Sequence, residues 1–285
     1  MADDKLKKKL TVAPKITELR ATEDKKVEIK WKKVPLAEKY AVNRSLVPDG
    51  DFEMVDWAKE TSFIDETAEE NVTYWYKIVA WKKMEGKKVS KKGSAVKAVC
   101  VSDIPCVNKL TSKAQKDEIH LEWEKGVGDK FFIYRRCNFF SRMVLAGESN
   151  KNSFIDKGAV PGIIYHYTVQ TVKSEAEKSL HGNFSAESVC VCLGETEILS
   201  AKATIGNKGL IGVRVIAGAD GYIFERSDKK DGEFTEVGRT EDITAVNFEE
   251  KLPSRFKNYY YRVCAYKMSG ETEFRGPYSP VKSVR

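Results

Sequence analysis

The sequence predicts an all-β chain of three tandem antiparallel β-sandwiches arranged end to end. One pattern of residues returns three times, about ninety residues apart. Within each copy, apolar and polar residues alternate with a period of two, and glycine, proline and aspartate mark turns between these runs. No apolar stripe with the helical period extends beyond a turn or two, so helices are not expected. A repeat of roughly ninety residues is long enough to bury its own core.

The clearest part of the repeat is a run of alternating large residues, which predicts a half-buried strand. It occupies residues 74–80, 165–171 and 259–265. Other recurring positions are an aromatic and an acid before the run, a serine after it, and an aromatic with an arginine further upstream. They are Phe63 and Asp65, Phe154 and Asp156, Phe248 and Glu250; Ser94, Ser185 and Ser279; Tyr40 and Arg44, Phe131 and Arg135, Tyr222 and Arg226. We therefore predict modules at 12–102, 103–193 and 194–285, behind a basic N-terminal tail at 1–11.

These positions resemble tandem fibronectin type III modules, which have an immunoglobulin-like fold. The resemblance rests on a strand-B tryptophan (Trp31, Trp123), the strand-C aromatic, and the strand-F run that follows Leu252 and Pro253 as in a tyrosine corner. It covers nearly the whole chain. Val213 stands where the third copy should carry the tryptophan, which predicts a smaller or repacked third core. Residues 218–222, 226–227, 232–234 and 278–284 also resemble modules of Gram-positive bacterial surface or secreted proteins.

The resemblance implies a non-enzymatic rod of a bacterial surface or secreted protein, acting as a spacer or scaffold or in protein or cell-surface interaction. One alternative is an adhesin or carbohydrate-binding module that uses exposed aromatic residues of the first copy. Another is an accessory region of a polysaccharide-acting enzyme. The implied partners are a protein or a glycan at a cell surface, and the chain is expected to be monomeric or part of a longer protein.

Composition limits the other functions. The formal net charge is +7, but the lysines are scattered, so no nucleic-acid partner is expected. No apolar run has the length of a membrane span. The basic N-terminus has no apolar stretch behind it and is not a secretory signal, which leaves a cytoplasmic location as the alternative to the cell surface. The six cysteines do not recur at one module position, which favours thiols over a disulfide framework.

No catalytic constellation is recognisable. His120 and His166 are predicted to face outward on opposite sheets, and His181 lies in a hairpin, so they cannot share a metal. Asp65, Asp156 and Glu250 recur in all three modules, which favours a structural role at a turn over a catalytic pair. We therefore predict no enzyme activity, no catalytic residue, no metal site and no cofactor.

The candidate ligand-binding residues are aromatic. Strand alternation predicts that they face solvent, where aromatic rings can stack on sugars or anchor a protein. They are Trp57, Trp75, Trp81, Phe132 and Tyr134. The alternatives are that a long side chain lies across Trp75, or that Trp81 packs on the neighbouring module.

A second candidate is a basic hairpin in the first module, made of Lys82, Lys83, Lys87, Lys88, Lys91 and Lys92. It is either a solvated hairpin that protects a sheet edge or a basic tip that meets an anionic polymer. The segments between modules, 99–105 and 189–195, are short and carry valines, so the chain is expected to pass directly from a last strand to a first strand with limited bending.

Overall fold

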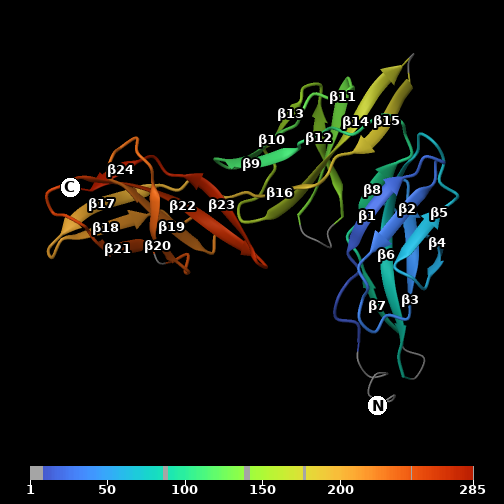
Figure 1. Ribbon diagram of the computed structural model, residues 1–285, viewed down its shortest axis with the longest axis horizontal. Coiled ribbons are helices and arrows are strands. Elements are labelled where there is room, and N and C mark those ends of the chain that lie inside the picture. Colours follow the sequence, from blue (N-terminus) through green and yellow to red (C-terminus); the bar gives the residue numbers. More distant parts are fainter. Residues whose placement is uncertain (1–8, 86–88, 138–141, 176–177, 245, 285) are drawn as a thin grey trace. The chain divides into compact units, whose positions relative to one another are not determined.

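The computed structural model describes residues 9–85, 89–137, 142–175, 178–244 and 246–284, and every regular element in these ranges is a strand (Figure 1). The strands form three pairs of antiparallel sheets, each pair consisting of one three-stranded and one five-stranded sheet. The prediction of an all-β chain of three sandwiches is confirmed.

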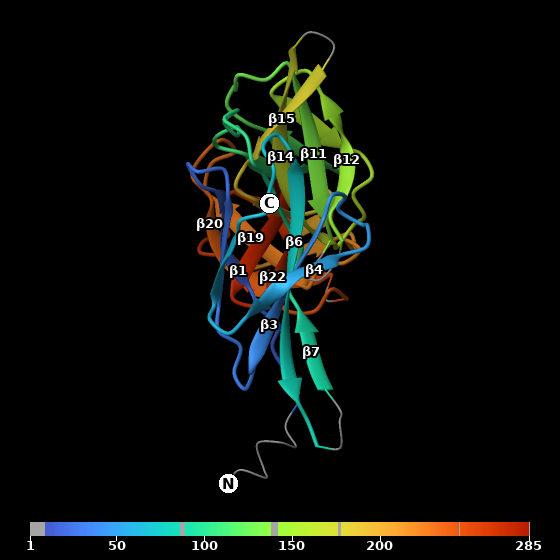
Figure 2. The ribbon, with the colours of Figure 1, turned by 90° about the vertical axis from the view of Figure 1, so that its right-hand side faces the viewer.

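Module 1 comprises β1 to β8. Its strands are β1 (Ile16–Ala21), β2 (Val27–Trp31), β3 (Lys39–Ser45), β4 (Glu53–Ala58), β5 (Ser62–Asp65), β6 (Thr73–Lys83), β7 (Val89–Gly93) and β8 (Lys97–Cys100). One sheet has the order β1-β2-β5, and the other has the order β4-β3-β6-β7, with β8 also paired to β6. Strands β6 and β7 lie side by side (Figure 2).

Module 2 comprises β9 to β16. Its strands are β9 (Thr111–Gln115), β10 (Glu118–Glu122), β11 (Lys130–Arg136), β12 (Val144–Ser149), β13 (Ser153–Asp156), β14 (Ile164–Glu175), β15 (Lys178–Phe184) and β16 (Ser188–Val191). The sheet orders are β13-β10-β9 and β12-β11-β14-β15, with β16 paired to β14.

Module 3 comprises β17 to β24. Its strands are β17 (Ile198–Thr204), β18 (Lys208–Val213), β19 (Gly221–Ser227), β20 (Thr235–Thr240), β21 (Asn247–Lys251), β22 (Tyr259–Ser269), β23 (Thr272–Tyr278) and β24 (Lys282–Val284). Its orders, β17-β18-β21 and β20-β19-β22-β23 with β24 on β22, repeat those of module 1.

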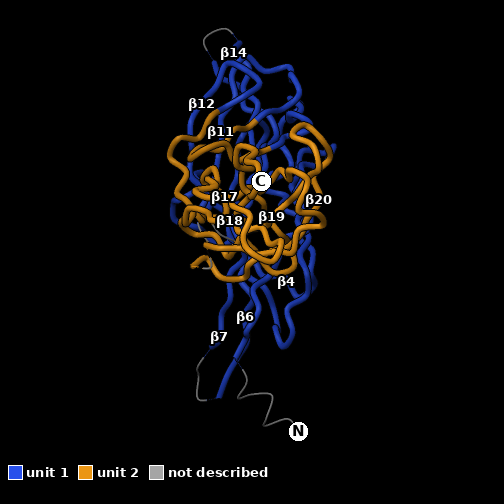
Figure 3. The backbone as a smooth tube through the Cα atoms, turned by 90° about the vertical axis from the view of Figure 1, so that its left-hand side faces the viewer, with its two compact units in different colours: residues 1–111, 122–154, 166–188 blue, residues 112–121, 155–165, 189–285 orange. Residues whose placement is uncertain are grey.

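The division of the chain into compact units does not follow the modules. Unit 1 contains the described residues of 1–111, 122–154 and 166–188, and unit 2 contains those of 112–121, 155–165 and 189–285 (Figure 3). All of module 1 and most of the five-stranded sheet of module 2 belong to unit 1. Module 3 belongs to unit 2.

The core of module 1 follows the alternation of its strands. The three-stranded sheet contributes the buried side chains of Val27, Ile29 and Trp31 to this core, and the five-stranded sheet contributes those of Tyr76 and Ile78. The indole of Trp31 meets the ring of Tyr40 edge-on, 5.3 Å between centroids. The inward phase predicted for these strands is confirmed.

The core of module 3 is packed differently, as Val213 predicted. In place of the tryptophan–tyrosine contact, Phe224 on β19 stacks on Phe248 on β21, with 4.3 Å between centroids. Val213 itself is buried in the same cluster. Phe224 stands where module 1 has Val42, so the third core has a smaller residue at one position and a larger one at another.

The recurring serine has one function in all three modules. The hydroxyl oxygens of Ser94, Ser185 and Ser279 accept the backbone N–H groups of Ile78, Val169 and Val263, at 2.9, 3.0 and 3.0 Å. Each of the three serines is buried. An N–H group of the long central strand would otherwise lack a partner inside the protein, which explains why the serine returns with the module.

The segment before module 2 differs from the prediction. Strand β8 ends at Cys100 and β9 begins only at Thr111, so the chain does not pass directly from one strand to the next. Val101 and Val107 are buried, and Val101 packs in the core of module 1. These valines therefore anchor an irregular segment by burial.

Candidate functional site

Trp75 lies on the outer face of β6, opposite in phase to Tyr76, and it is nevertheless only 1% exposed. The expectation that it faces solvent is wrong, because aromatic residues of module 2 cover it. Its ring centroid lies 5.1 Å from that of Tyr134 and 5.4 Å from that of Phe184, both edge-on. Val96 and Met143 complete the cluster. We call these five side chains the junction cluster.

The predicted outward phase of Tyr134 is therefore compatible with burial. Tyr134 and Phe184 also contact one another, 5.6 Å between centroids. Burial raises the pKa of the Tyr134 hydroxyl to about 12, with the nearby Glu148 carboxylate acting in the same direction. Tyr134 is a packing residue of this junction and not a free ligand platform.

Polar contacts surround the junction cluster inside unit 1. The Gln170 amide donates to the Thr73 hydroxyl at 2.9 Å, and Gln170 is 1% exposed. The Asn183 amide donates to the carbonyl oxygen of Ser102 at 3.0 Å, and the Asn183 backbone N–H donates to that of Ile104 at 3.1 Å. These bonds join residues that are far apart in sequence, so the contact between the two modules has a specific register as well as an apolar centre.

Glycine is required at one point of this contact. A Cβ atom at Gly182 would lie 2.7 Å from the side chain of Ile104 and 3.0 Å from its carbonyl oxygen. The backbone of β15 therefore approaches residue 104 more closely than any larger residue permits.

An ionic cluster borders the junction cluster. The Arg136 guanidinium donates to both carboxylate oxygens of Glu187, at 3.1 and 2.8 Å, and His166 Nδ1 lies 3.5 Å from the same carboxylate. Burial acts to raise the pKa of Glu187, but the His166 hydrogen bond and the charges of Arg136 and Lys97 outweigh it and lower the pKa to about 2. Glu187 and Lys97 line a cavity of about 350 Å³.

The other two candidate tryptophans form a pair on module 1 that is partly open to solvent. Trp57 on β4 is 38% exposed and Trp81 on β6 is partly buried, with 6.2 Å between ring centroids in an edge-on geometry. The ammonium of Lys39 lies 3.5 Å from the centroid of Trp57 and 4.8 Å from that of Trp81. A long side chain therefore does lie across two tryptophans, but across these two and not across Trp75.

Phe132 is separate from both groups. It is partly buried on β11, its ring centroid lies 5.5 Å from the His181 ring, and the Lys130 ammonium lies 5.4 Å from its centroid. The five predicted aromatics therefore do not form one platform. They divide into the buried Trp75 with the partly buried Tyr134, the exposed Trp57 with the partly buried Trp81, and Phe132.

The basic hairpin is only partly as predicted. Lys83, Lys91 and Lys92 are exposed, whereas Lys82 is 4% exposed. The prediction for Lys82 is wrong, because it shares the inward phase of Ile78 and Ala80 along β6. Lys87 and Lys88 lie outside the described residues.

The recurring acid joins the two sheets of its module. In module 1, the hydroxyl of Tyr76 and the guanidinium of Arg44 both donate to Asp65 Oδ2, each at 2.7 Å, and the Thr67 backbone N–H donates to Oδ1 at 2.9 Å. Although burial opposes it, these donors hold the pKa of Asp65 below its usual value. The structural role predicted for this acid is confirmed in module 1.

Module 3 has the same arrangement with a longer acid. Both Tyr261 and Arg226 donate to Glu250, the arginine at 2.7 Å. In module 2, Asp156 accepts the Gly158 backbone N–H at 3.0 Å. The tyrosine–acid–arginine contact was missed in the sequence, although its three members recur together and that recurrence was the signal for it.

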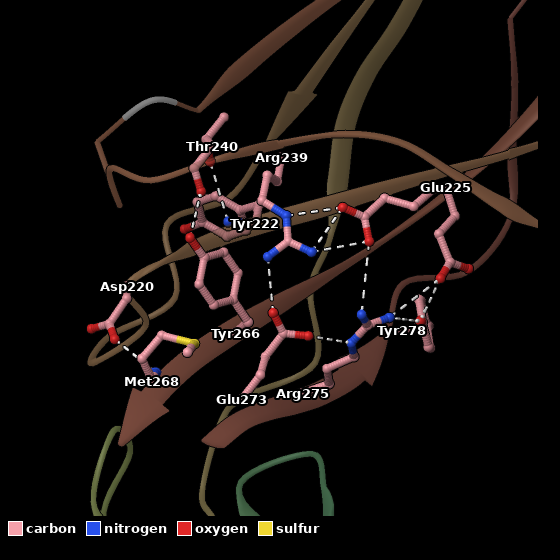
Figure 4. Close-up of polar contacts among 11 residues, drawn as sticks. Asp220, Tyr222, Glu225, Arg239, Thr240, Tyr266, Met268, Glu273, Arg275 and Tyr278 are labelled. Carbon is pink, nitrogen blue, oxygen red and sulfur yellow. Dashed lines mark hydrogen bonds and ion pairs between the residues drawn. The ribbon is translucent and has the colours of Figure 1, made fainter. Parts of the chain in front are cut away.

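The outer face of the five-stranded sheet in module 3 carries a network of charges (Figure 4). Glu225 accepts from Arg262 at 2.6 Å and from the Tyr278 hydroxyl at 2.7 Å. Arg239 donates to Glu273 at 2.9 Å and pairs with Glu236 at 2.8 Å. Arg275 donates to Glu273 at 2.8 Å. Three arginines and three glutamates thus compensate one another.

Among the described residues, no group of three or more histidine, cysteine, aspartate or glutamate side chains is arranged to hold a metal ion. In the same part of the chain, no helix has the length and apolar character that crossing a bilayer requires.

Each module has the strand order of a fibronectin type III-like, immunoglobulin-like sandwich. No family model and no curated protein matches the chain. Among solved structures, the chain is similar to the FN1-FN3 domains of chicken CNTN1, at 14% identity over 95% of this chain and 98% of that chain, with a TM-score of 0.29. The fold assignment rests on the strand order and registers within the modules.

Proposed function

We propose that this chain is a non-enzymatic scaffold of a bacterial surface or secreted protein, in which modules 1 and 2 are held as one rigid body. The observation that supports this proposal most strongly is the junction cluster, in which Tyr134 and Phe184 bury Trp75. An aromatic side chain on the outer face of a sheet is exposed in an isolated module, so its burial favours a fixed contact between modules. The proposal includes the division of the chain into modules that end at residues 102 and 193.

The test is the tumbling of the two modules in solution. Backbone ¹⁵N relaxation of the full chain should give the same rotational correlation time for β3 of module 1 and β11 of module 2. Trp75→Ala should make the two values differ while the chemical shifts of the module 1 core persist, because Trp75 is not part of that core. Trp81→Ala serves as the matched control, since that tryptophan lies on the same strand outside the junction cluster. Independent tumbling in the unmodified chain would contradict the proposal.

A second function, that of an adhesin or carbohydrate-binding module, is favoured by the pair of Trp57 and Trp81. Indole faces on an open sheet stack on the C–H groups of sugar rings and anchor protein partners. Trp57 lies on β4 and Trp81 on β6. On β6, Trp81 and Trp75 lie at opposite ends of the pairing with β3, so the pair is separate from the junction cluster and a scaffold can also carry this site. Loss of glycan binding in Trp57→Ala, with an unchanged melting temperature, would support it.

A further inference from the structure

The charge network of module 3 has an uncompensated counterpart in module 1. Strands β19, β20 and β22 of module 3 pair in the same registers as β3, β4 and β6 of module 1, including the irregularity between the third and fourth pairs of β19 with β20. The pairing of β22 with β23 differs from that of β6 with β7 only by a register shift between Cys264 and Tyr266. Tyr222 opposite Ala265 corresponds to Tyr40 opposite Ala80. Each outer-face position of one module can therefore be matched to a position of the other.

The three acids of the module 3 network have no acidic counterpart in module 1. The position of Glu225 is taken by Asn43, that of Glu236 by Met54 and that of Glu273 by Val89. Two of the three basic residues are retained: Lys77 occupies the position of Arg262, and Lys91 occupies that of Arg275. Glycine at 93 replaces Tyr278, and Trp57 replaces Arg239. Module 1 has thus kept two cations of the network and lost all three carboxylates.

The lysines on this face consequently lack acidic partners. Among the described residues, Lys39, Lys77 and Lys91 form no ion pair with a carboxylate, and the contacts of Lys39 are those with the two indoles. Lys77 extends over the glycine, since a Cβ atom at Gly93 would lie 2.8 Å from Lys77 Cε. The Lys39 ammonium is therefore held against the two indoles, and Lys77 and Lys91 lie on the same outer face without a carboxylate partner among the described residues.

Two acids adjoin residues of this face in the sequence, Glu38 beside Lys39 and Asp56 beside Trp57, and each has a backbone donor. Glu38 accepts the Lys83 backbone N–H at 3.3 Å, and Asp56 accepts the Trp57 backbone N–H at 2.7 Å. Neither forms an ion pair with the three lysines. This excess of positive charge contrasts with the outer face of module 3, where three glutamates pair with three arginines.

We propose that the outer face formed by Trp57, Trp81, Lys39, Lys77 and Lys91 binds an anionic polysaccharide whose charge is carried by the carboxylates of uronic acids. The indoles stack on the C–H face of a sugar ring, and the ammonium groups pair with the carboxylates on neighbouring rings. A neutral sugar would leave the three ammonium groups unpaired, and a polyanion without rings would leave the indoles unused. This inference rests on the carbohydrate-binding function proposed above and names its ligand class.

The experiment is calorimetric titration of the full chain with polygalacturonic acid. The fully methyl-esterified polymer, which has the same rings without charge, and poly-glutamate, which has charge without rings, are titrated beside it. We expect saturable binding of polygalacturonic acid, at least about tenfold weaker for either comparison polymer. Trp57→Ala should weaken binding of the acid polymer by about tenfold or more.

A variant that restores the missing acids provides the sharpest test. Met54 and Val89 are both exposed, so M54E/V89E should fold normally, neutralise the face as in module 3, and weaken binding by about tenfold. Lys92→Ser is the matched control, because Lys92 is exposed on the same strand but lies opposite Ala80, in the alternate phase. It should change affinity by less than about twofold.

Three results would overturn the proposal. Equal binding of the esterified polymer, lost in Trp57→Ala, would exclude the anionic class and leave the carbohydrate-binding function intact. Equal binding of poly-glutamate, unaffected by Trp57→Ala, would reduce the site to general attraction of polyanions. Absence of binding to all three polymers by a folded chain would contradict both the ligand class and the carbohydrate-binding function of this face.

Discussion

The ring of Trp75 meets the ring of Tyr134 edge-on, with 5.1 Å between centroids and 62° between planes. The two residues come from the outer faces of sheets in different modules. Each would be exposed if its module stood alone, so each owes its burial to the other. Edge-on aromatic pairs contribute about 0.5–1.5 kcal/mol beyond the burial of their area. The contact therefore couples the stability of module 1 to that of module 2.

Trp75→Ala should uncouple the unfolding of these modules. Removing a buried tryptophan costs about 3–5 kcal/mol, and here the loss falls on the contact between modules and not on either core. In differential scanning calorimetry of the full chain, we expect the shared transition of modules 1 and 2 to separate into two. Trp81→Ala should leave it single. A single transition that merely moves to lower temperature in Trp75→Ala would contradict this coupling.

Asp65→Ala should destabilise module 1 because it leaves the buried Tyr76 hydroxyl and the partly buried Arg44 guanidinium without this acceptor. The expected loss is about 2–3 kcal/mol, compared with about 1 kcal/mol for Tyr76→Phe, which removes one donor and leaves the carboxylate paired. Amide hydrogen exchange of β6 as a function of urea concentration measures the loss of unfolding free energy in each variant. An Asp65→Ala loss no larger than that of Tyr76→Phe would show that the network contributes little.

The ion pair between Glu187 and Arg136 should weaken in acid. Its folded pKa of about 2 lies below the ordinary value of 4.5, so the ionised carboxylate stabilises the folded state. That stabilisation is complete above about pH 4.5 and is lost progressively as the pH falls toward 2. The difference amounts to about 3 kcal/mol at most. Melting temperatures from pH 7 to pH 2 should fall less steeply for Glu187→Gln, and parallel curves for both proteins would contradict the assignment.

Thiol reactivity should follow burial. Burial raises the pKa values of Cys190 and Cys264 to about 11, and the thiolate is the reactive form. Cys137 is exposed. In the native chain at pH 8, iodoacetamide should modify Cys137 first and should reach Cys190 and Cys264 only after denaturant is added, as read by peptide mass spectrometry. Rapid native modification of Cys264 would show that its strand opens readily.

Strand alternation was sufficient to predict which residues point inward. The phase of Tyr76 and Ile78 on β6 is confirmed, and even the error at Lys82 was avoidable, since Lys82 has the same phase. Alternation also placed Trp75 correctly on the outer face. It could not predict burial there, because the side chains that cover Trp75 come from β11 and β15 of another module.

The polar sites were less accessible to prediction. Recurrence of Asp65 with Tyr76 and Arg44 predicted a structural role but not the bonds, since these depend on the two sheets facing one another. The loss of acids from the outer face of module 1 becomes apparent only when the registers align Met54 with Glu236 and Val89 with Glu273. Cross-strand register is set by turns and bulges, which the sequence pattern does not position to one residue.

The most direct test of the rigid pair of modules is a distance distribution between two spin labels, one in each module. Cysteines introduced at Ile64 on β5 and Leu145 on β12, both exposed, would carry the labels in a chain whose Cys106 and Cys137 are replaced by serine. Double electron–electron resonance should give one narrow distribution for this chain and a broad one for its Trp75→Ala variant. A broad distribution already present with Trp75 intact would contradict the central claim that the junction cluster holds modules 1 and 2 together.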